Sequence, residues 1–193
     1  MILILLAALV VIKRFATGSV LDKPQDGFLM QLVNSVNLFF LLIVNPLAAI
    51  LMICRNLEVI DPTRIQFNSS GLAAILETAG LAVYVIGYLL MGWALICLEK
   101  NYQLGGSTPR KSDELVFKGP YRFLRHPMYA AALQISLGLA GLTRSWAFLA
   151  FFGLYLFLIL LLIPVEEKGL REAYGRQYAP YRQRTKKLLP LVY

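Results

Sequence analysis

The sequence predicts an all-α integral membrane protein with about five transmembrane helices. Three observations predict this fold class: 58% of the 193 residues are hydrophobic and only 16% are charged, the apolar residues gather in five segments, and basic residues flank those segments. A soluble domain of this length carries more charge. The net charge of +8 would suit nucleic acid, but basic residues beside apolar segments are typical of membrane anchors. We therefore expect membrane lipids, and no nucleic acid, as partners.

The helices are expected where the apolar segments lie, and two of these segments are amply long enough to cross a bilayer. A hydrocarbon core of about 30 Å needs about 20 residues at a rise of about 1.5 Å each. The fourth and fifth segments are shorter and are joined by a tight link, so we expect them to fold back on each other as a helical hairpin. The five segments run roughly over residues 1–15, 28–54, 71–98, 128–142 and 146–165.

The basic residues predict which side of the membrane each connection occupies. No basic residue precedes the first apolar run, whereas Lys13 and Arg14 follow it, which is the reverse of a secretory signal, so we expect a retained helix. Sixteen of the 19 Lys and Arg residues follow the first helix, follow the third helix or lie in the C-terminal tail. This asymmetry predicts that loop 99–127 and the C-terminus are cytoplasmic and that the N-terminus is outside.

The chain is expected to form a single membrane domain over residues 1–193, because it contains no internal repeat and no low-complexity tract. Within it we distinguish an N-terminal three-helix part, 1–98, from a second part, 99–193, that holds the polar loop, the helical hairpin and the tail.

Polar residues inside the apolar segments need partners, because lipid offers none. Asn34 and Asn37 lie three residues apart and so on one helix face, where they either bond to another helix, which we favour, or line a polar substrate site. Glu77 either pairs with a cation or sits near the interface. Cys54 and Cys97 are interpreted as small packing residues, since two cysteines establish neither a disulfide framework nor a metal motif. No metal is expected.

The connection between the third and fourth segments concentrates polar, basic and turn-forming residues. It includes Leu115-Val116-Phe117, an apolar patch suited to cover a flat ligand ring or to pack on the bilayer. His126, the only histidine of the chain, precedes Pro127, which can open the fourth helix without losing a hydrogen bond. Free backbone amides at a helix start favour anionic ligand groups. The cluster is either an interfacial anchor or a ligand site.

The fifth segment is expected to end near Pro164 and the adjacent carboxylates Glu166 and Glu167. Carboxylates at a membrane boundary are unfavourable unless solvated or paired, so they mark a helix end, receive a cationic ligand or balance the basic loop. Beyond them, apolar and aromatic residues recur at helical spacing among basic ones, which predicts a cytoplasmic amphipathic C-terminal helix that rests on anionic lipid or closes over a ligand. These residues are Leu170, Tyr174, Tyr178 and Tyr181.

Together these motifs resemble the isoprenylcysteine carboxyl methyltransferase family and its bacterial relatives, over roughly residues 103–190. The resemblance rests on Asp113-Glu114-Leu115-Val116, Gly119-Pro120-Tyr121, Arg125-His126-Pro127-Met128-Tyr129, Glu166-Glu167, and Tyr174-Gly175 with Tyr178, Tyr181 and Leu189-Pro190. It implies an integral membrane enzyme that moves a methyl group from S-adenosylmethionine to a lipophilic acceptor and releases S-adenosylhomocysteine. The implied cofactor contacts are Gln103, Asp113, Glu114, Leu115, Val116, Tyr121, His126, Pro127, Met128, Tyr129 and Glu166, with Glu167 as an additional candidate.

One position departs from the family pattern. Members that act on a prenylcysteine carboxylate have an arginine four residues before the first of the paired glutamates, and this chain has Leu162 there. Leucine cannot bind a carboxylate, a group that guanidinium usually holds. Either Arg122, Arg125 or Arg171 substitutes, or the acceptor is a lipid amine, a thiol or another small lipophilic nucleophile. Methyl transfer is an in-line displacement that depends on positioning, so we assign no covalent nucleophile.

Two other functions remain open at the level of sequence. A membrane reductase related to sterol reductases, with NADPH as cofactor, has a similar loop, and Arg110 and Lys111 would suit a 2′-phosphate, but such enzymes have more membrane helices than this chain supplies. A non-catalytic membrane module would use the same polar segments for assembly or lipid anchoring. That function predicts no cofactor affinity and tolerance of His126→Ala.

Overall fold

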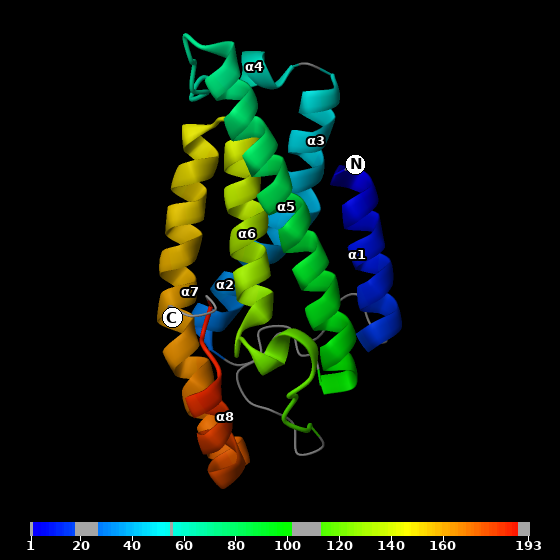
Figure 1. Ribbon diagram of the computed structural model, residues 1–193, viewed down its shortest axis with the longest axis vertical. Coiled ribbons are helices and arrows are strands. Elements are labelled where there is room, and N and C mark those ends of the chain that lie inside the picture. The colour runs from blue at the N-terminus through cyan, green and yellow to red at the C-terminus, as the bar shows by residue number, and fades with distance from the viewer. Residues whose placement is uncertain (1, 18–26, 55, 102–112, 189–193) are drawn as a thin grey trace.

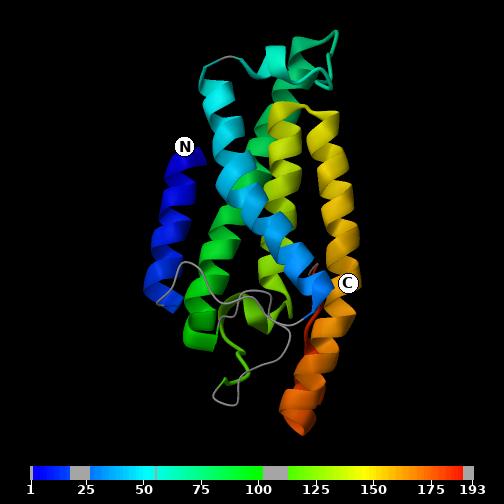
Figure 2. The same cartoon turned by 180° about the vertical axis from the view of Figure 1, so that it is seen from behind.

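Helices make up every regular element in the part of the chain that the computed structural model describes, which comprises residues 2–17, 27–54, 56–101 and 113–188. The elements are α1 (Ile2–Thr17), α2 (Phe28–Phe39), η1 (Phe40–Val44), α3 (Asn45–Ile53), α4 (Leu57–Ile60), α5 (Ser70–Leu98), η2 (Glu99–Asn101), η3 (Gly119–Arg122), α6 (Pro127–Thr143), α7 (Trp146–Tyr174), η4 (Gly175–Gln177) and α8 (Tyr178–Arg184). The long helices run side by side in an elongated bundle (Figure 1 and, from behind, Figure 2). The all-α class predicted from the sequence is confirmed.

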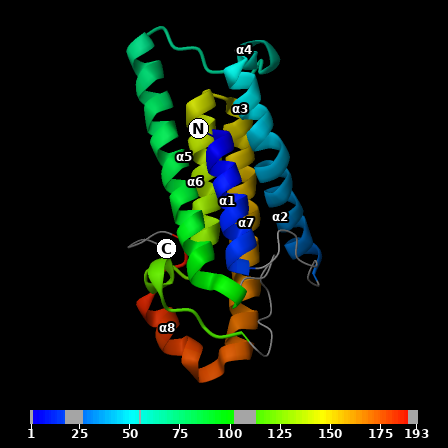
Figure 3. The ribbon, with the colours of Figure 1, turned by 90° about the vertical axis from the view of Figure 1, so that its right-hand side faces the viewer.

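Three helical stretches are long and apolar enough to cross a membrane: Phe28–Ile53, Ser70–Leu98 and Trp146–Arg184. The helices α1 and α6, with 16 and 17 residues, are shorter, and they lie within the same bundle (Figure 3). The chain thus has the build of an integral membrane protein. Five complete crossings, with the N-terminus outside, stay a prediction.

The predicted hairpin is present and consists of α6 and α7. Pro127 occupies the first turn of α6, where a missing N–H costs no helix bond. That helix ends at Thr143, and the next residue, Arg144, has a left-handed φ of 56° that reverses the chain. Ser145 then caps α7, because its Oγ accepts a hydrogen bond from the Phe148 amide at 3.3 Å. Local signals therefore fix both ends of the turn.

A π-helical turn, η1, interrupts the stretch from α2 to α3. Pro46 follows this turn and has no N–H to donate to the carbonyl four residues earlier, where its ring would also clash in a regular α-helix. The wider turn accommodates the proline. It also accompanies a stacked contact between Phe40 and Phe151 of α7, with ring centroids 4.6 Å apart.

The helices α5 and α6 approach each other backbone to backbone, because glycines line their interface. A Cβ on Gly87 would lie 2.9 Å from the backbone nitrogen of Ile135, and a Cβ on Gly138 would overlap the backbone of Tyr84. Residues without a side chain allow this approach, as is common between membrane helices. The contact fixes the spacing of the two helices that carry one wall of the site.

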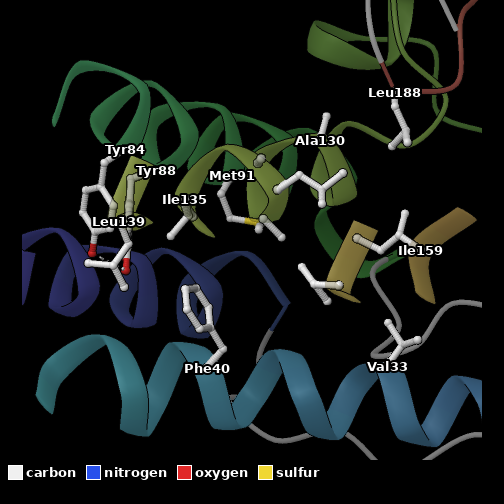
Figure 4. Close-up of a cluster of buried hydrophobic side chains, with 14 of the residues drawn as sticks. Val33, Phe40, Tyr84, Tyr88, Met91, Ala130, Ile135, Leu139, Ile159 and Leu188 are labelled. Atoms are coloured by element: carbon white, nitrogen blue, oxygen red, sulfur yellow. Dashed lines mark hydrogen bonds between the residues drawn. The ribbon is translucent and has the colours of Figure 1, made fainter. Parts of the chain in front are cut away.

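Buried side chains from α2, α5, α6 and α7 form the core of the bundle (Figure 4). Ile135, Leu139 and Ile159 are fully buried. The hydroxyl of Tyr84 donates a hydrogen bond to Asn45 Oδ1 at 2.6 Å between α5 and α3. Because lipid tails are as apolar as these side chains, close packing and such hydrogen bonds, rather than removal from water, hold membrane helices together.

The helix α7 is longer than the sequence predicts, since it continues past Pro164 and both glutamates to Tyr174. The expected end near residue 165 is therefore wrong. A proline removes a single helix bond, and the Glu167 carboxylate is neutralised by partners described below, so neither feature stops the helix. The chain turns at Gly175, whose φ is 49°, and α8 folds back from the end of α7 (Figure 3). The predicted amphipathic set is thus divided: Leu170 and Tyr174 lie on α7, and the buried Tyr178 and Tyr181 lie on α8.

Glu77 has cationic partners at the end of the bundle away from α8. Its Oε1 lies 2.8 Å from Nε of Arg144 and 3.7 Å from Nη2 of Arg64. Both arginines belong to connections between helices, so the carboxylate ties these connections together. Pairing with a cation, one of the two roles considered for Glu77, is the one that the structure supports.

Candidate active site

A cavity of about 1030 Å³, including the open space at its mouth, lies where α2, α5, α6, α7 and α8 meet the segment that precedes α6. Gln103 falls outside the described residues, and Glu167 does not line the cavity. The structure brings the other ten predicted contact residues together around it. These are Asp113, Glu114, Leu115, Val116, Tyr121, His126, Pro127, Met128, Tyr129 and Glu166.

Nine further residues also line the cavity, and the sequence did not identify them as cofactor contacts. Some had a signal: the three-residue spacing of the two asparagines marked one face of α2, and the helical spacing of the tail marked a possible cover. No sequence pattern marked the α5 residues or Asn101, because the sequence of an apolar helix or of a loop does not show which of its side chains face a cavity. The nine are Asn34, Asn37, Met91, Leu98, Asn101, Arg125, Leu170, Tyr174 and Tyr181.

The segment before α6 is held against the end of α5. Gly119 has a φ of 59°, and a Cβ there would lie 2.9 Å from Nε1 of Trp93, so glycine allows both the turn and the contact. Pro120 follows, and its carbonyl accepts a hydrogen bond from the Leu124 amide at 3.0 Å. The amide of Glu114 donates to Oδ1 of Asn101 at 3.2 Å. These contacts present the 113–116 run to the cavity.

The C-terminal segment is paired to the residues that lead into α6. The amide of Arg125 donates to the carbonyl of Lys186 at 2.7 Å, and the amide of His126 donates to that of Lys187 at 3.1 Å. In return the amide of Lys186 donates to the carbonyl of Phe123 at 2.9 Å. Residues 186 and 187 of the tail are therefore fixed against the residues that lead into the site.

Aromatic contacts complete the cover of the cavity. The ring of Phe117 packs edge-on against Tyr181 of α8, with centroids 5.3 Å apart. Leu115 and Val116, from the same apolar patch, line the cavity itself. The patch thus joins the tail to the cavity wall, which agrees better with covering a ligand than with packing on the bilayer.

Arg125 and Glu167 form the main ion pair behind the cavity wall. Nε of Arg125 donates to Oε1 of Glu167 at 2.7 Å. Nη1 of Arg125 also donates to the carbonyl of Arg182 at 3.0 Å and to the carbonyl of Thr185. The guanidinium therefore connects α7, α8 and the tail, and its hydrogen-bonding groups are largely taken by the protein itself.

His126 sits between the two glutamates. Its Nδ1 lies 3.5 Å from Oε2 of Glu166, and its Nε2 lies 3.6 Å from Oε1 of Glu167. Burial lowers the pKa of the imidazole, but the neighbouring charge of Glu166 and then that of Glu167 outweigh burial and raise this pKa above its ordinary value. The ring also stacks on Tyr129, with centroids 5.7 Å apart. A protonated histidine is thus favoured at this wall.

Two polar atoms at this wall form no hydrogen bond within the described part of the chain. They are Nε2 of His126 and Oε2 of Glu166, and both are buried. Buried polar groups in proteins are normally satisfied, so this pair is suited to a polar ligand. Among the residues that the structure describes, there is no group of three or more His, Cys, Asp or Glu residues that could hold a metal ion.

Three arginines elsewhere in the chain were considered as replacements for the arginine that is missing at position 162. None of them offers a free guanidinium to the cavity. Arg125 lines the cavity but is bonded to Glu167. Arg122 and Arg171 do not line it, and Nε of Arg171 donates to the carbonyl of Glu167 at 3.2 Å. Leu162 itself is buried in the core and does not reach the cavity.

Comparisons with known proteins agree with this architecture. The phospholipid methyltransferase family model matches residues 76–177, which is more than half of the chain and includes most of α5, all of α6 and α7, and the segment before α6. Protein-S-isoprenylcysteine O-methyltransferase B of Arabidopsis thaliana is 30% identical over 115 residues, a match that spans 58% of this chain and 58% of the plant protein. The cobalt-zinc-cadmium resistance protein CzcN of Cupriavidus metallidurans is 37% identical over 82 residues, 42% of this chain and 38% of that protein.

The fold is also found in a solved structure, that of the eukaryotic intramembrane Ras methyltransferase ICMT. It matches with a TM-score of 0.55 at 20% identity and covers 84% of this chain and 74% of that one. These matches give no support to the membrane reductase considered from the sequence. In sequence and in fold, the chain is similar to isoprenylcysteine carboxyl methyltransferases. Because the family model covers most of α5, the polar segment, α6 and α7, which together supply most of the residues that line the cavity, this integral membrane chain belongs to the phospholipid methyltransferase family.

Proposed function

We propose that this protein transfers a methyl group from S-adenosylmethionine to a lipophilic acceptor within the membrane. The observation that carries the proposal is the cavity, in which the buried His126 and the partly buried Glu166 face a space that also reaches the apolar helices α2 and α5. A water-soluble donor and an oily acceptor need such a shared space. Membership of a methyltransferase family supports the same reaction.

The residues around the cavity fit the chemistry of this cofactor. S-adenosylmethionine carries a sulfonium cation whose methyl group is the one transferred, together with an α-amino acid group and an adenosine. Glu166 supplies a carboxylate for a cation, and the rings of Tyr129 and Tyr174 supply faces that attract one. His126 offers a donor for a carboxylate or a ring nitrogen. Leu115 and Val116 supply apolar surface for a flat ring.

The protein's contribution is positioning and exclusion of water. Bringing donor and acceptor into line removes much of the entropic barrier of a bimolecular displacement, and enclosure strengthens electrostatic interactions inside the site. The tail assists by pairing with residues 123–126 and by placing Tyr181 over the cavity. No side chain is assigned as a covalent nucleophile. Glu167 is proposed as a positioning residue, since it holds Arg125 and His126.

The acceptor is proposed to enter from the bilayer while the cofactor enters from the cytoplasm. The plant relative is named for a prenylcysteine substrate, but Leu162 stands here where a carboxylate-binding arginine would be expected. The proposed acceptors therefore include a lipid amine, a thiol or another lipophilic nucleophile. Loop 99–127 and the C-terminus are proposed to be cytoplasmic and the N-terminus outside, which cysteine labelling from each side of sealed vesicles would test.

Cofactor binding is the first test. Purified protein in detergent is titrated with S-adenosylhomocysteine and separately with NADPH by calorimetry. We expect S-adenosylhomocysteine to bind and NADPH not to. We expect Glu166→Gln and His126→Ala each to weaken binding about tenfold, as loss of a charged hydrogen-bonding partner does. Glu172→Gln is the matched control, because Glu172 lies on the same helix with an exposed side chain. Binding of NADPH alone would overturn the proposal.

Methyl transfer is the second test. The protein is incubated with a radiolabelled methyl donor and either total membrane lipids or small thiols, and the labelled product is identified. Label in an organic-soluble product is the expected result. Full binding of S-adenosylhomocysteine without transfer to either class would contradict the lipophilic acceptor and leave a cofactor-binding module instead.

A further inference from the structure

Two amides on α2 reach the cavity from within the membrane-spanning stretch. Asn34 and Asn37 both line the cavity. At a rise of about 1.5 Å per residue they lie roughly 9 and 13 Å along the helix from Phe28. An amide at that depth is unfavourable against lipid, and the three-residue spacing turns both toward the same side. They line the cavity, whereas adhesion between helices was the role that the sequence favoured.

Asn37 has hydrogen-bonding capacity that the described part of the chain does not use. Its Oδ1 is buried and forms no hydrogen bond within the described part of the chain. A buried amide in apolar surroundings gains considerably from a partner, because water is excluded there. Since the atom belongs to a residue that lines the cavity, a bound molecule can supply that partner.

Charged and uncharged residues of the cavity lining come from different elements of the fold. Its charged lining residues come from the segment before α6 and from α7: Asp113, Glu114, Arg125, His126 and Glu166. The helices α2 and α5 contribute only uncharged residues to the lining, namely the two asparagines, Met91 and Leu98. The cofactor of the proposed function belongs to the charged side, which leaves the amide-bearing side to the acceptor.

No described cation is available to bind an acidic head group in this cavity. Arg125 is the only Arg or Lys among the described lining residues, and its guanidinium is bonded to Glu167, Arg182 and Thr185. His126 faces Glu166 and Glu167, and the proposed function assigns it to the cofactor. A carboxylate brought to the α2 amides from the bilayer would therefore lose its hydration there without gaining a counter-ion from the described side chains beyond those that the proposed function assigns to the cofactor.

We propose that Asn34 and Asn37 form the acceptor head-group subsite and that this subsite selects an uncharged polar head with at least one N–H or O–H, against a carboxylate. This inference rests on the proposed function. The head donates to Oδ1 of one asparagine and accepts from the amide N–H of the other, as neutral amides do with such groups. That contact fixes the acceptor and leaves a lone pair for reaction.

Methyl transfer to a head group with an N–H or O–H conserves both atoms and charge. The lone pair of the acceptor atom forms the new bond to the methyl carbon while the carbon–sulfur bond of the sulfonium breaks and its electron pair stays on sulfur. The positive charge moves to the acceptor atom, which then releases its own proton to water. The asparagines only position the head, so their loss should raise KM more than it lowers kcat at saturating acceptor.

The test uses two fatty ligands that differ only in the head group, dodecanamide and dodecanoate, added to protein saturated with S-adenosylhomocysteine. Binding is measured by calorimetry at a pH where the dodecanoate is ionised. We expect dodecanamide to bind at least about tenfold more tightly than dodecanoate. Asn37→Leu, which is close in volume and suits an apolar helix, should weaken dodecanamide binding by about threefold to tenfold. Asn37→Ser keeps a hydrogen-bonding group and should recover part of that loss.

The controls separate this subsite from the proposed function. Ser35→Ala changes a polar residue on the exposed face of the same helix and should leave both ligands unaffected. Asn37→Leu should leave the affinity for S-adenosylhomocysteine within about twofold, since the cofactor is held elsewhere. Failure of the wild type to bind S-adenosylhomocysteine overturns the proposed function. Normal cofactor binding with equal or tighter binding of dodecanoate, or with no effect of Asn37→Leu on dodecanamide, overturns the subsite alone.

Discussion

Arg125 and Glu167 form an ion pair that is almost completely removed from water. Nε and Oε1 are 2.7 Å apart, and the two side chains are only 7% and 5% exposed. A buried pair is a weak source of net stability, but breaking it leaves an uncompensated charge in the interior. The pair connects α7 to the residues before α6, so we expect its loss to disturb the cavity wall.

The first prediction concerns this pair. Glu167→Leu leaves the Arg125 guanidinium buried without its carboxylate, and we expect the free energy of unfolding to fall by about 3–5 kcal/mol. The double variant Arg125→Met/Glu167→Leu removes both charges and should lose less than the single variant. Unfolding in mixed detergent micelles measures these two variants and the single variant Arg125→Met. Losses in the double variant that equal the sum of two single losses would show that the pair is not coupled. Lys168→Ala, at an exposed pair with Glu172, should change little.

The second prediction concerns pH. The pKa of His126 is raised in the folded protein because, despite burial, Glu166 and Glu167 favour the protonated ring. A raised folded pKa contributes stability that is fully present below the ordinary histidine value of about 6.5 and is lost as the pH rises through the raised value. We therefore expect the difference in melting temperature between wild type and His126→Asn to shrink as the pH is raised from about 6 to about 9. A difference that grows over this range would contradict the assignment.

The positions of the helices were largely predictable because they depend on local chemistry. Apolar runs of sufficient length, a proline at a helix start and a serine before a helix act within a few residues of themselves. Pro127 therefore opens α6 as the sequence suggested, and α7 begins at Trp146, where the fifth segment was expected to begin. The same local reasoning failed at Pro164 and the two glutamates, where α7 continues, because it could not foresee that Glu167 pairs with an arginine 42 residues earlier in the chain.

The sequence predicted which residues line the cavity better than it predicted what each of them does there. The resemblance drew attention to the 113–129 segment and to Glu166, and these residues do share one cavity. It could not distinguish Glu166 from Glu167, because only the three-dimensional structure shows which carboxylate faces the cavity and which faces Arg125. The spacing of the two asparagines predicted that they share one face of α2. What that face contacts depends on how helices that are distant in the sequence pack together.

The third prediction concerns the close approach of α5 and α6. Gly138→Ala adds a Cβ that would overlap the backbone of Tyr84, so the helices must separate. We expect a loss of about 1–3 kcal/mol, as overpacking usually causes, despite the gain of about 1 kcal/mol in helix propensity. Gly153→Ala is the matched control, since nothing lies within 4 Å of a Cβ there. Unfolding of both variants in mixed micelles measures the contrast, and a Gly138→Ala protein as stable as the control would show that the helices are not in backbone contact.

The last prediction concerns Leu162, the position where an arginine would be expected in an enzyme that acts on a lipid carboxylate. Leu162 is fully buried in the core and does not line the cavity. Leu162→Arg would therefore place an unpaired guanidinium among apolar side chains, and we expect the free energy of unfolding to fall by at least about 3 kcal/mol. Leu162→Met, which nearly conserves volume, should lose less than about 1.5 kcal/mol. Because the new arginine would not reach the cavity, Leu162→Arg protein that remains folded should gain no methyl transfer to a lipid carboxylate. A variant that melts like the wild type and methylates a carboxylate would show that this position faces the acceptor.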